Sequence, residues 1–289
     1  EWSGMEGEEE TFAALISPMP EAVNRAYQGY GETFRKGFLA LNRGDFDVAV
    51  EKLSRAMEEC GSEPGYIPLE LATAYMNLEM AERAEPLARV FLREHPMSIR
   101  GYQILCEILW EQGDSPRALE LLDDCPEEMA RSVPILALRG EMLFRAGRFE
   151  EAEELYSSAM KTCGRQEMLT RALARIWDHQ GKKEKARGLY GEILEGCNTC
   201  GARGDPLVKR RFADLSLELG DRSPRVLEHY LSLVHEDPGR RAEYYRKISR
   251  IYDRQGYREE ADRYREFARR AGGKADGTSG DDKDKEHSL

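Results

Sequence analysis

The chain has 289 residues, of which 40% are hydrophobic and 34% are charged, and its formal net charge at pH 7 is −11. This acidic balance argues against general nucleic-acid binding, which needs a basic face to displace counterions. No apolar run approaches the roughly 18 residues that a membrane-spanning helix requires, so we expect no membrane span in this chain.

The first 29 residues divide into two parts of different composition. Residues 1–11 are acidic and rich in Gly and Glu, which predicts a disordered N-terminus. Residues 12–29 contain apolar side chains and two prolines. We expect this second part to pack on the segment that follows it, as an irregular N-terminal capping segment.

From residue 30 onward a pattern recurs with a period close to 34 residues. A turn residue recurs in steps of 35, 34, 34, 34, 39 and 36 residues, at Gly44, Glu79, Gly113, Gly147, Gly181, Gly220 and Gly256. A small residue follows most of these turns five positions later, at Ala49, Ala84, Ala118, Ala152, Ala186 and Ala261. In the sixth unit the matching residue is Val226, displaced by one position.

Each unit predicts two helices of about a dozen residues joined by a tight turn. In the unit centred on Gly147, apolar residues stand at helical spacing on both sides of the turn. Glycine suits the turn because it adopts the left-handed backbone conformation without a Cβ clash, and the alanines allow two helices to approach closely. Because β-type alternation is absent, we expect an all-α fold.

The Gly/Ala/Tyr/Ala set in "GRFEEAEELYSSAM", and its counterparts "GDSPRALELLDDC", "GKKEKARGLYGEIL" and "AERAEPLARVFLREHP", resembles the tetratricopeptide repeat (TPR) family. The resemblance covers residues 30–271 and about seven repeats. It implies a right-handed α-solenoid, a superhelix of tandem helix-turn-helix repeats whose first helices line a concave groove. Residues 272–289 nearly lack apolar side chains and predict a disordered, solvated tail.

In such a solenoid the inner positions of the first helices would bind a partner protein or peptide. The first half of the groove would be apolar, through Phe34, Phe38, Tyr66, Met76, Trp110 and Phe144. The second half would carry cations that meet an acidic segment of the partner, through Arg171, Arg175, His179, Arg210, Arg246 and Arg250. Two alternatives remain open. In the first, the N-terminal segment would cover Phe34 and Phe38. In the second, the arginines would pair with acidic neighbours on their own helices.

The family's carboxylate clamp, which holds chaperone tails, uses Lys and Asn at particular inner positions. Asn42 and Asn77 fall at one inner position of their repeats, but lysine partners do not recur. A chaperone-tail receptor is therefore not expected.

Two of the six cysteines form a close pair, Cys197 and Cys200, in the segment 196–206. This segment coincides with the longest step of the repeat, so we expect a short inserted loop. A CxxC pair suits a disulfide or half of a zinc site, and no second CxxC completes a four-thiolate set. The pair stays open between a structural or incidental role, a disulfide, and a metal or redox site.

Nothing else in the sequence indicates chemistry. The five histidines stand singly, without a metalloprotease pattern. We therefore expect a non-enzymatic interaction scaffold without a cofactor. Two alternatives remain: a self-assembling homo-oligomer, and a redox- or zinc-dependent regulator acting through Cys197 and Cys200. The compartment is unknown. A cytoplasmic location is favoured, and a periplasmic or membrane-anchored one stays open because the chain begins at Glu1 and not at Met.

Overall fold

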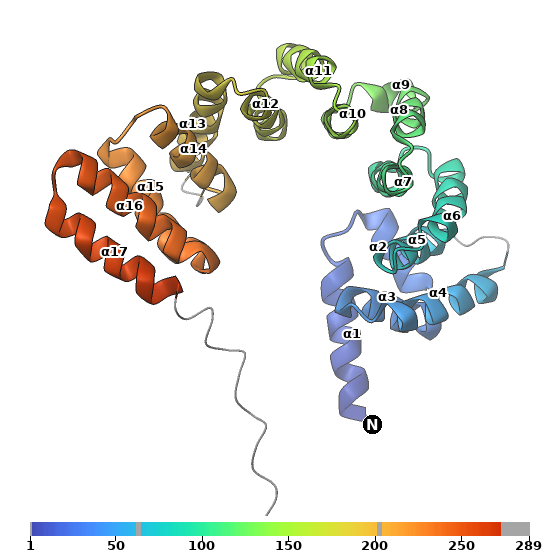
Figure 1. Cartoon of the computed structure of the whole chain (residues 1–289). Helices are drawn as coiled ribbons and strands as arrows, with labels where there is room; N and C mark the ends of the chain where they lie inside the picture. Colours follow the sequence, from blue (N-terminus) through green and yellow to red (C-terminus); the bar gives the residue numbers. More distant parts are fainter. Residues whose placement is uncertain (1, 62–64, 201–203, 273–289) are drawn as a thin grey trace, which may run out of the picture. The chain divides into compact units, whose positions relative to one another are not determined.

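The computed structural model describes residues 2–61, 65–200 and 204–272, with the side chains of 2–6 and 197–200 outside this description. Every regular element in these ranges is a helix, which confirms the all-α prediction (Figure 1). The chain forms two compact units, unit 1 over Glu1–Leu155 and unit 2 over Tyr156–Leu289. The expected tail falls on residues 273–289, outside the described ranges, and stays a prediction.

The described chain begins with helix α1 (Trp2–Ile16), where the composition predicts disorder over residues 1–11. Two apolar residues at the end of α1, Phe12 and Ile16, are buried, and the Phe12 ring meets that of Phe38 edge-on, 5.7 Å away. Glu9 pairs with Arg35 at 2.5 Å. The acidic composition did not indicate this helix, because its acidic residues pair with cations of the first repeat and buried apolar residues follow them.

Helix α2 (Glu21–Gly29) carries one fully buried aromatic side chain, Tyr27. Its ring packs edge-on against Phe34 at 5.1 Å and Phe38 at 5.3 Å. Residues 12–29 thus lie on the first repeat as the end of α1 followed by α2, and are largely helical where an irregular segment was expected.

Seven helix pairs follow, in agreement with about seven predicted repeats. In unit 1 the pairs are α3 (Glu32–Arg43) with α4 (Phe46–Cys60), α5 (Ile67–Asn77) with α6 (Ala81–Glu94), and α7 (Ile99–Glu111) with α8 (Ser115–Asp123). A single turn, α9 (Glu127–Ala130), then leads to α10 (Val133–Arg145) and α11 (Phe149–Thr162), in which the unit boundary falls. Within unit 1, Figure 1 shows α5, α7 and α10 on one side and α6 and α8 on the other.

Unit 2 also consists of helix pairs. Its pairs are α12 (Glu167–His179) with α13 (Lys183–Cys200), α14 (Pro206–Glu218) with α15 (Pro224–Glu236), and, after the short helix η1 (Pro238–Arg240), α16 (Arg241–Gln255) with α17 (Arg258–Gly272). None of the helices in the described ranges combines the length and apolar character needed to cross a membrane.

The turn positions predicted from the repeat are confirmed. All seven have a positive φ, from 59° at Glu79 to 89° at Gly256, and Glu79 is the one non-glycine residue of this kind in the described ranges. The seven small residues that follow the turns, from Ala49 to Ala261, are all fully buried. The left-handed turn and the buried small residue together close each helix pair.

Ion pairs also join first helices of consecutive repeats. In unit 1, Arg145 of α10 pairs with Glu107 of α7 at 2.7 Å. In unit 2, Arg211 of α14 pairs with Asp178 of α12 at 2.5 Å, and Lys247 of α16 pairs with Asp214 of α14 at 2.7 Å. Each side chain therefore bridges one repeat to the next.

Candidate functional site

Unit 1 contains a cavity of about 1330 Å³ on the side of its first helices, which we call the α3/α5 groove. Helix α2, the C-terminal end of α3, helix α5 and the turn between α6 and α7 form its walls. Seven of its lining residues stand at the inner positions that the repeat pattern predicts: Phe38, Leu41, Asn42, Tyr66, Leu69, Thr73 and Asn77. The remaining wall comes from α2 and from residues 94–100.

An ion pair between a buried carboxylate and a half-buried arginine anchors the base of the groove. The Glu70 side chain is fully buried and accepts two hydrogen bonds from the Arg100 guanidinium, at 2.5 Å and 2.8 Å. The Tyr27 hydroxyl donates a third hydrogen bond to the same carboxylate. Burial, and then the negative charge of Glu70, raise the pKa of Tyr27. The three residues tie α2, α5 and the start of α7 together, which fixes three walls relative to one another.

Tyr66 lies at the start of α5 as a half-buried aromatic wall of the groove. Its ring stacks on that of His95, with centroids 4.6 Å apart and planes 19° from parallel. Its backbone N–H donates to the Tyr30 hydroxyl at 2.8 Å. Tyr66 is therefore a rigid surface that one face of a ligand can contact.

The rim of the groove carries exposed apolar side chains. Met97, in the turn before α7, is 52% exposed, and Ile99, the first residue of α7, is 36% exposed. Asn42 and Asn77 are exposed on the opposite helices, and each amide donates to a carbonyl of its own helix at 2.8 Å. The groove thus combines an apolar interior with a rim that is partly apolar and partly polar, as peptide-binding surfaces are.

Phe34 and Phe38 are not the exposed anchors that the sequence predicted. They are 1% and 3% exposed and belong to the core beneath α1 and α2, so the reading in which the N-terminal segment covers them is the correct one. Of the two, Phe38 is among the residues that line the groove and Phe34 is not. The covering residues, Phe12 and Tyr27, lie too early in the chain for the repeat pattern to include them.

The other predicted residues of unit 1 are half-buried. Met76 lies near the end of α5 and outside the residues that line the groove. The Trp110 ring lies beneath the Arg145 guanidinium, 5.4 Å from its centroid, and Arg145 is held by both Glu107 and Glu141. Phe144 contacts Phe149 edge-on at 5.4 Å. Trp110 is therefore covered on one face by its own chain.

In unit 2 the predicted cations differ in their surroundings. Arg171 pairs with Glu167 at 2.6 Å and with Asp205, so its guanidinium is already neutralised. For this residue the alternative of an intramolecular pair is the correct one. Arg175 and His179 are exposed on α12.

Arg210, Arg246 and Arg250 belong to neighbouring first helices, α14 and α16. Arg210 is half-buried, whereas Arg246 and Arg250 are exposed. A second cavity, of about 380 Å³, lies between these helices and is lined by Asp214, Leu217, Glu218, Tyr230, Lys247, Arg250 and Arg254. We call this the α14/α16 cleft.

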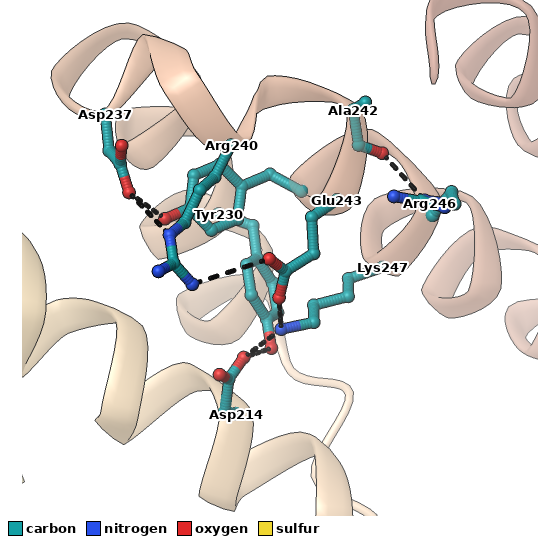
Figure 2. Close-up of polar contacts among 9 residues, drawn as sticks. Asp214, Tyr230, Asp237, Arg240, Ala242, Glu243, Arg246 and Lys247 are labelled. Carbon is teal, nitrogen blue, oxygen red and sulfur yellow. Dashed lines mark hydrogen bonds and ion pairs between the residues drawn. The ribbon is translucent and has the colours of Figure 1, made fainter. Parts of the chain in front are cut away.

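The acidic residues of the α14/α16 cleft are neutralised by neighbours. Figure 2 shows the Lys247 amine between two carboxylates, Asp214 at 2.7 Å and Glu243 at 2.6 Å. The Tyr230 hydroxyl also donates to Asp214 at 2.7 Å. Burial first, and then Asp214, raise the pKa of Tyr230. Glu218 pairs with Lys183 at 2.8 Å.

The CxxC pair falls partly outside the description. Helix α13 continues to Cys200, so the first part of segment 196–206 is helical and not a loop. The side chains of Cys197 and Cys200 lie outside the described residues, and their pairing stays untested. Elsewhere in the described ranges, no group of three or more His, Cys, Asp or Glu side chains is placed to hold a metal ion.

Several groove residues were missed by sequence reasoning. Glu70 and Arg100 are 30 residues apart on different repeats, and no pattern in one sequence couples them. Met97 and Ile99 follow the His95–Pro96 end of a repeat, where the pattern indicates only a turn. The available signal was that two large apolar residues stand where a turn alone would not require them.

Comparison with known proteins supports the repeat assignment. A family model described as tetratricopeptide repeat matches residues 104–124 and 134–157. No curated protein matches the chain. A solved TPR protein from Parabacteroides merdae is 18% identical, with 85% of this chain and 94% of that chain covered and a TM-score of 0.55.

Two further solved structures resemble the chain. BtubC (BKLC) from P. vanneervenii is 18% identical, with 73% of this chain and 96% of that chain covered and a TM-score of 0.57. YrrB, described as a TPR protein with an unusual peptide-binding site, is 16% identical, with coverages of 64% and 92% and a TM-score of 0.50. At these identities the likeness shows the fold. Together with the family match over two segments and the seven left-handed turns, it shows that the chain has the fold of tandem tetratricopeptide-type helix pairs.

Proposed function

We propose that this protein is a non-enzymatic scaffold that binds an apolar segment of a partner protein in the α3/α5 groove. The groove itself carries the proposal, because an open, apolar-lined cavity of about 1330 Å³ lies on the first helices of consecutive repeats. Small-molecule sites are typically about 300–1,000 Å³. The larger volume suits several side chains of a protein segment.

The rigidity of the walls supports the same function. The Glu70–Arg100 pair and the Tyr27 hydroxyl hold α2, α5 and α7 in place, so the groove exists before a ligand enters and little ordering cost falls on the protein. Tyr66 and Met97 offer an aromatic wall and a flexible thioether rim for an apolar side chain. The peptide-binding site named for YrrB provides a precedent on this fold.

A charge placed on the rim tests the proposal without disturbing the core. Met97 is 52% exposed, so Met97→Glu should leave the fold intact and place a carboxylate against the bound apolar segment. Met168 on α12 of unit 2 is 53% exposed and lies outside the groove, so Met168→Glu is a matched control. Both variants carry the same change in net charge.

The measurement is affinity capture from the native organism, with quantitative mass spectrometry of the captured proteins. We expect a partner that Met97→Glu loses by a factor of about ten or more, the scale of one hot-spot residue. Met168→Glu should retain it. If both variants capture the same proteins in the same amounts as the wild type, the groove is not the binding site. Sedimentation of the purified chain shows whether the partner is a second copy.

A further inference from the structure

Cations outnumber acids along the α14/α16 cleft in unit 2, although the chain as a whole is acidic. Arg246, Arg250 and Arg254 stand one turn apart on α16, and all three are exposed. Arg246 donates to the carbonyl of Ala242 at 3.1 Å, a backbone group of its own helix. We call these three residues the arginine row.

Among the described residues, no carboxylate pairs with any member of the arginine row. The two acids that line the cleft with Arg250 and Arg254 are already engaged, Asp214 by Lys247 and Tyr230, and Glu218 by Lys183. An arginine on a solvated helix face ordinarily pairs with an acid one turn away. The members of the row do not, although the chain carries a net charge of −11.

The spacing of the row selects the ligand. Members four residues apart on a helix are separated by about 6 Å along its axis. Alternate residues of an extended chain lie about 6.6 Å apart, so alternate Asp or Glu side chains match the row closely. A single phosphate favours donors that converge on one point, and here the charges are spread along a line.

We propose that the arginine row binds an acidic segment of a partner protein, with successive Asp or Glu carboxylates facing Arg246, Arg250 and Arg254. Leu217, which is half-buried, is the apolar side chain of the cleft against which the aliphatic part of the segment packs. The inference rests on the proposed function only in taking a protein segment as the ligand. It uses a different unit and different residues.

The probe is a fluorescein-labelled peptide of about twelve residues in which Glu alternates with Ser, long enough to span the row in extended form. Fluorescence anisotropy of the full-length protein measures its binding. The double variant Arg250→Gln/Arg254→Gln should weaken binding about fivefold, as expected for two exposed ion pairs. The matched control, Arg258→Gln/Arg263→Gln on α17, removes two exposed arginines with the same charge change and should bind as the wild type does.

Further peptides separate the possible ligands. A peptide with Gln in place of Glu should not bind, and raising the salt concentration should weaken binding of the Glu peptide because the pairs are exposed. Absence of Glu-peptide binding, equal binding by the row variant, or equal loss in the α17 control overturns the inference. Binding of a phosphoserine peptide or an oligonucleotide without binding of the Glu peptide overturns it as well. Met97→Glu should not weaken binding of the Glu peptide, so the proposal for the α3/α5 groove and the proposal for the arginine row are tested independently.

Discussion

Replacing Arg100 by Met should destabilise unit 1 by about 3 kcal/mol. The change leaves the Glu70 carboxylate, which is fully buried, with only the Tyr27 hydroxyl as a partner. Breaking a buried ion pair from one side typically costs about 3–5 kcal/mol. We take the lower end of this range because the Arg100 side chain is 41% exposed. Water can therefore replace part of the hydrogen bonding that the guanidinium gives to Glu70.

The same reasoning predicts a rescue. If the loss comes from an uncompensated carboxylate, removal of all three polar partners should restore most of the stability, since apolar replacements for buried pairs are often neutral. The triple variant Tyr27→Phe/Glu70→Leu/Arg100→Met should therefore lie within about 1 kcal/mol of the wild type. Glu70→Leu alone should be worse than the triple variant, because it leaves the buried Tyr27 hydroxyl and the Arg100 guanidinium without their acceptor.

Urea unfolding followed by tryptophan fluorescence measures these energies. The chain has three tryptophans, and Trp177 is the one in unit 2, so a Trp177→Phe background reports on unit 1 alone. The reasoning is refuted if Arg100→Met unfolds within 1 kcal/mol of its parent, on the scale of an ordinary surface pair. It is also refuted if the triple variant is as unstable as Arg100→Met, since packing and not charge would then be the cause.

Three further predictions concern stability and reactivity. Glu79→Gly should raise the free energy of unfolding by about 0.5–1 kcal/mol in urea titrations, because Glu79 has a φ of 59° and glycine enters this region without a Cβ clash; a loss would show that its side chain compensates. Burial raises the pKa of Tyr230, so the folded state keeps this proton after the unfolded chain loses it near pH 10. Stability is then fully present below pH 10 and falls above it, and Tyr230→Phe should flatten the fall by about 1.4 kcal/mol per pH unit; an unchanged slope would contradict this. Burial raises the pKa of the Cys106 thiol to about 12, so Cys60 and Cys163, which are half-buried, should react with a thiol reagent before Cys106 does. Mass spectrometry of labelled peptides that shows Cys106 reacting before both would be the contrary result.

The periodic features of the fold were predictable from sequence because they depend on local backbone and packing requirements. A left-handed turn favours glycine and a close helix crossing favours alanine, so both leave marks at fixed spacing. Even Glu79, which has the wrong residue type for such a turn, was found by its position in the period. The same periodicity predicted most of the first-helix residues that line the α3/α5 groove.

The non-periodic features were not predictable in this way. Helix α1 carries an acidic composition that suggests disorder, but its Phe12 ring packs on Phe38 and its Glu9 pairs with Arg35, both on α3. The exposure of Phe34 depends on whether α1 and α2 cover it, which the repeat pattern does not include. The pair of Arg171 with Glu167 is an i,i+4 pair that the sequence displays, whereas its second pair, with Asp205, joins two repeats and is not visible in the pattern.

The ion pairs between first helices imply that the repeats of unit 2 cannot be shuffled freely. Arg211 and Lys247 both stand nine residues before the turn glycine of their repeats, yet their acids stand three and six residues before theirs, at Asp178 and Asp214. Cations at one common position therefore reach acids about one helical turn apart. The helices of a duplicated or exchanged repeat would still pack on the new neighbour, but its cation would not face the acid of that neighbour. The ion pairs at the junctions therefore specify the order of the repeats, although the repeats share one backbone fold.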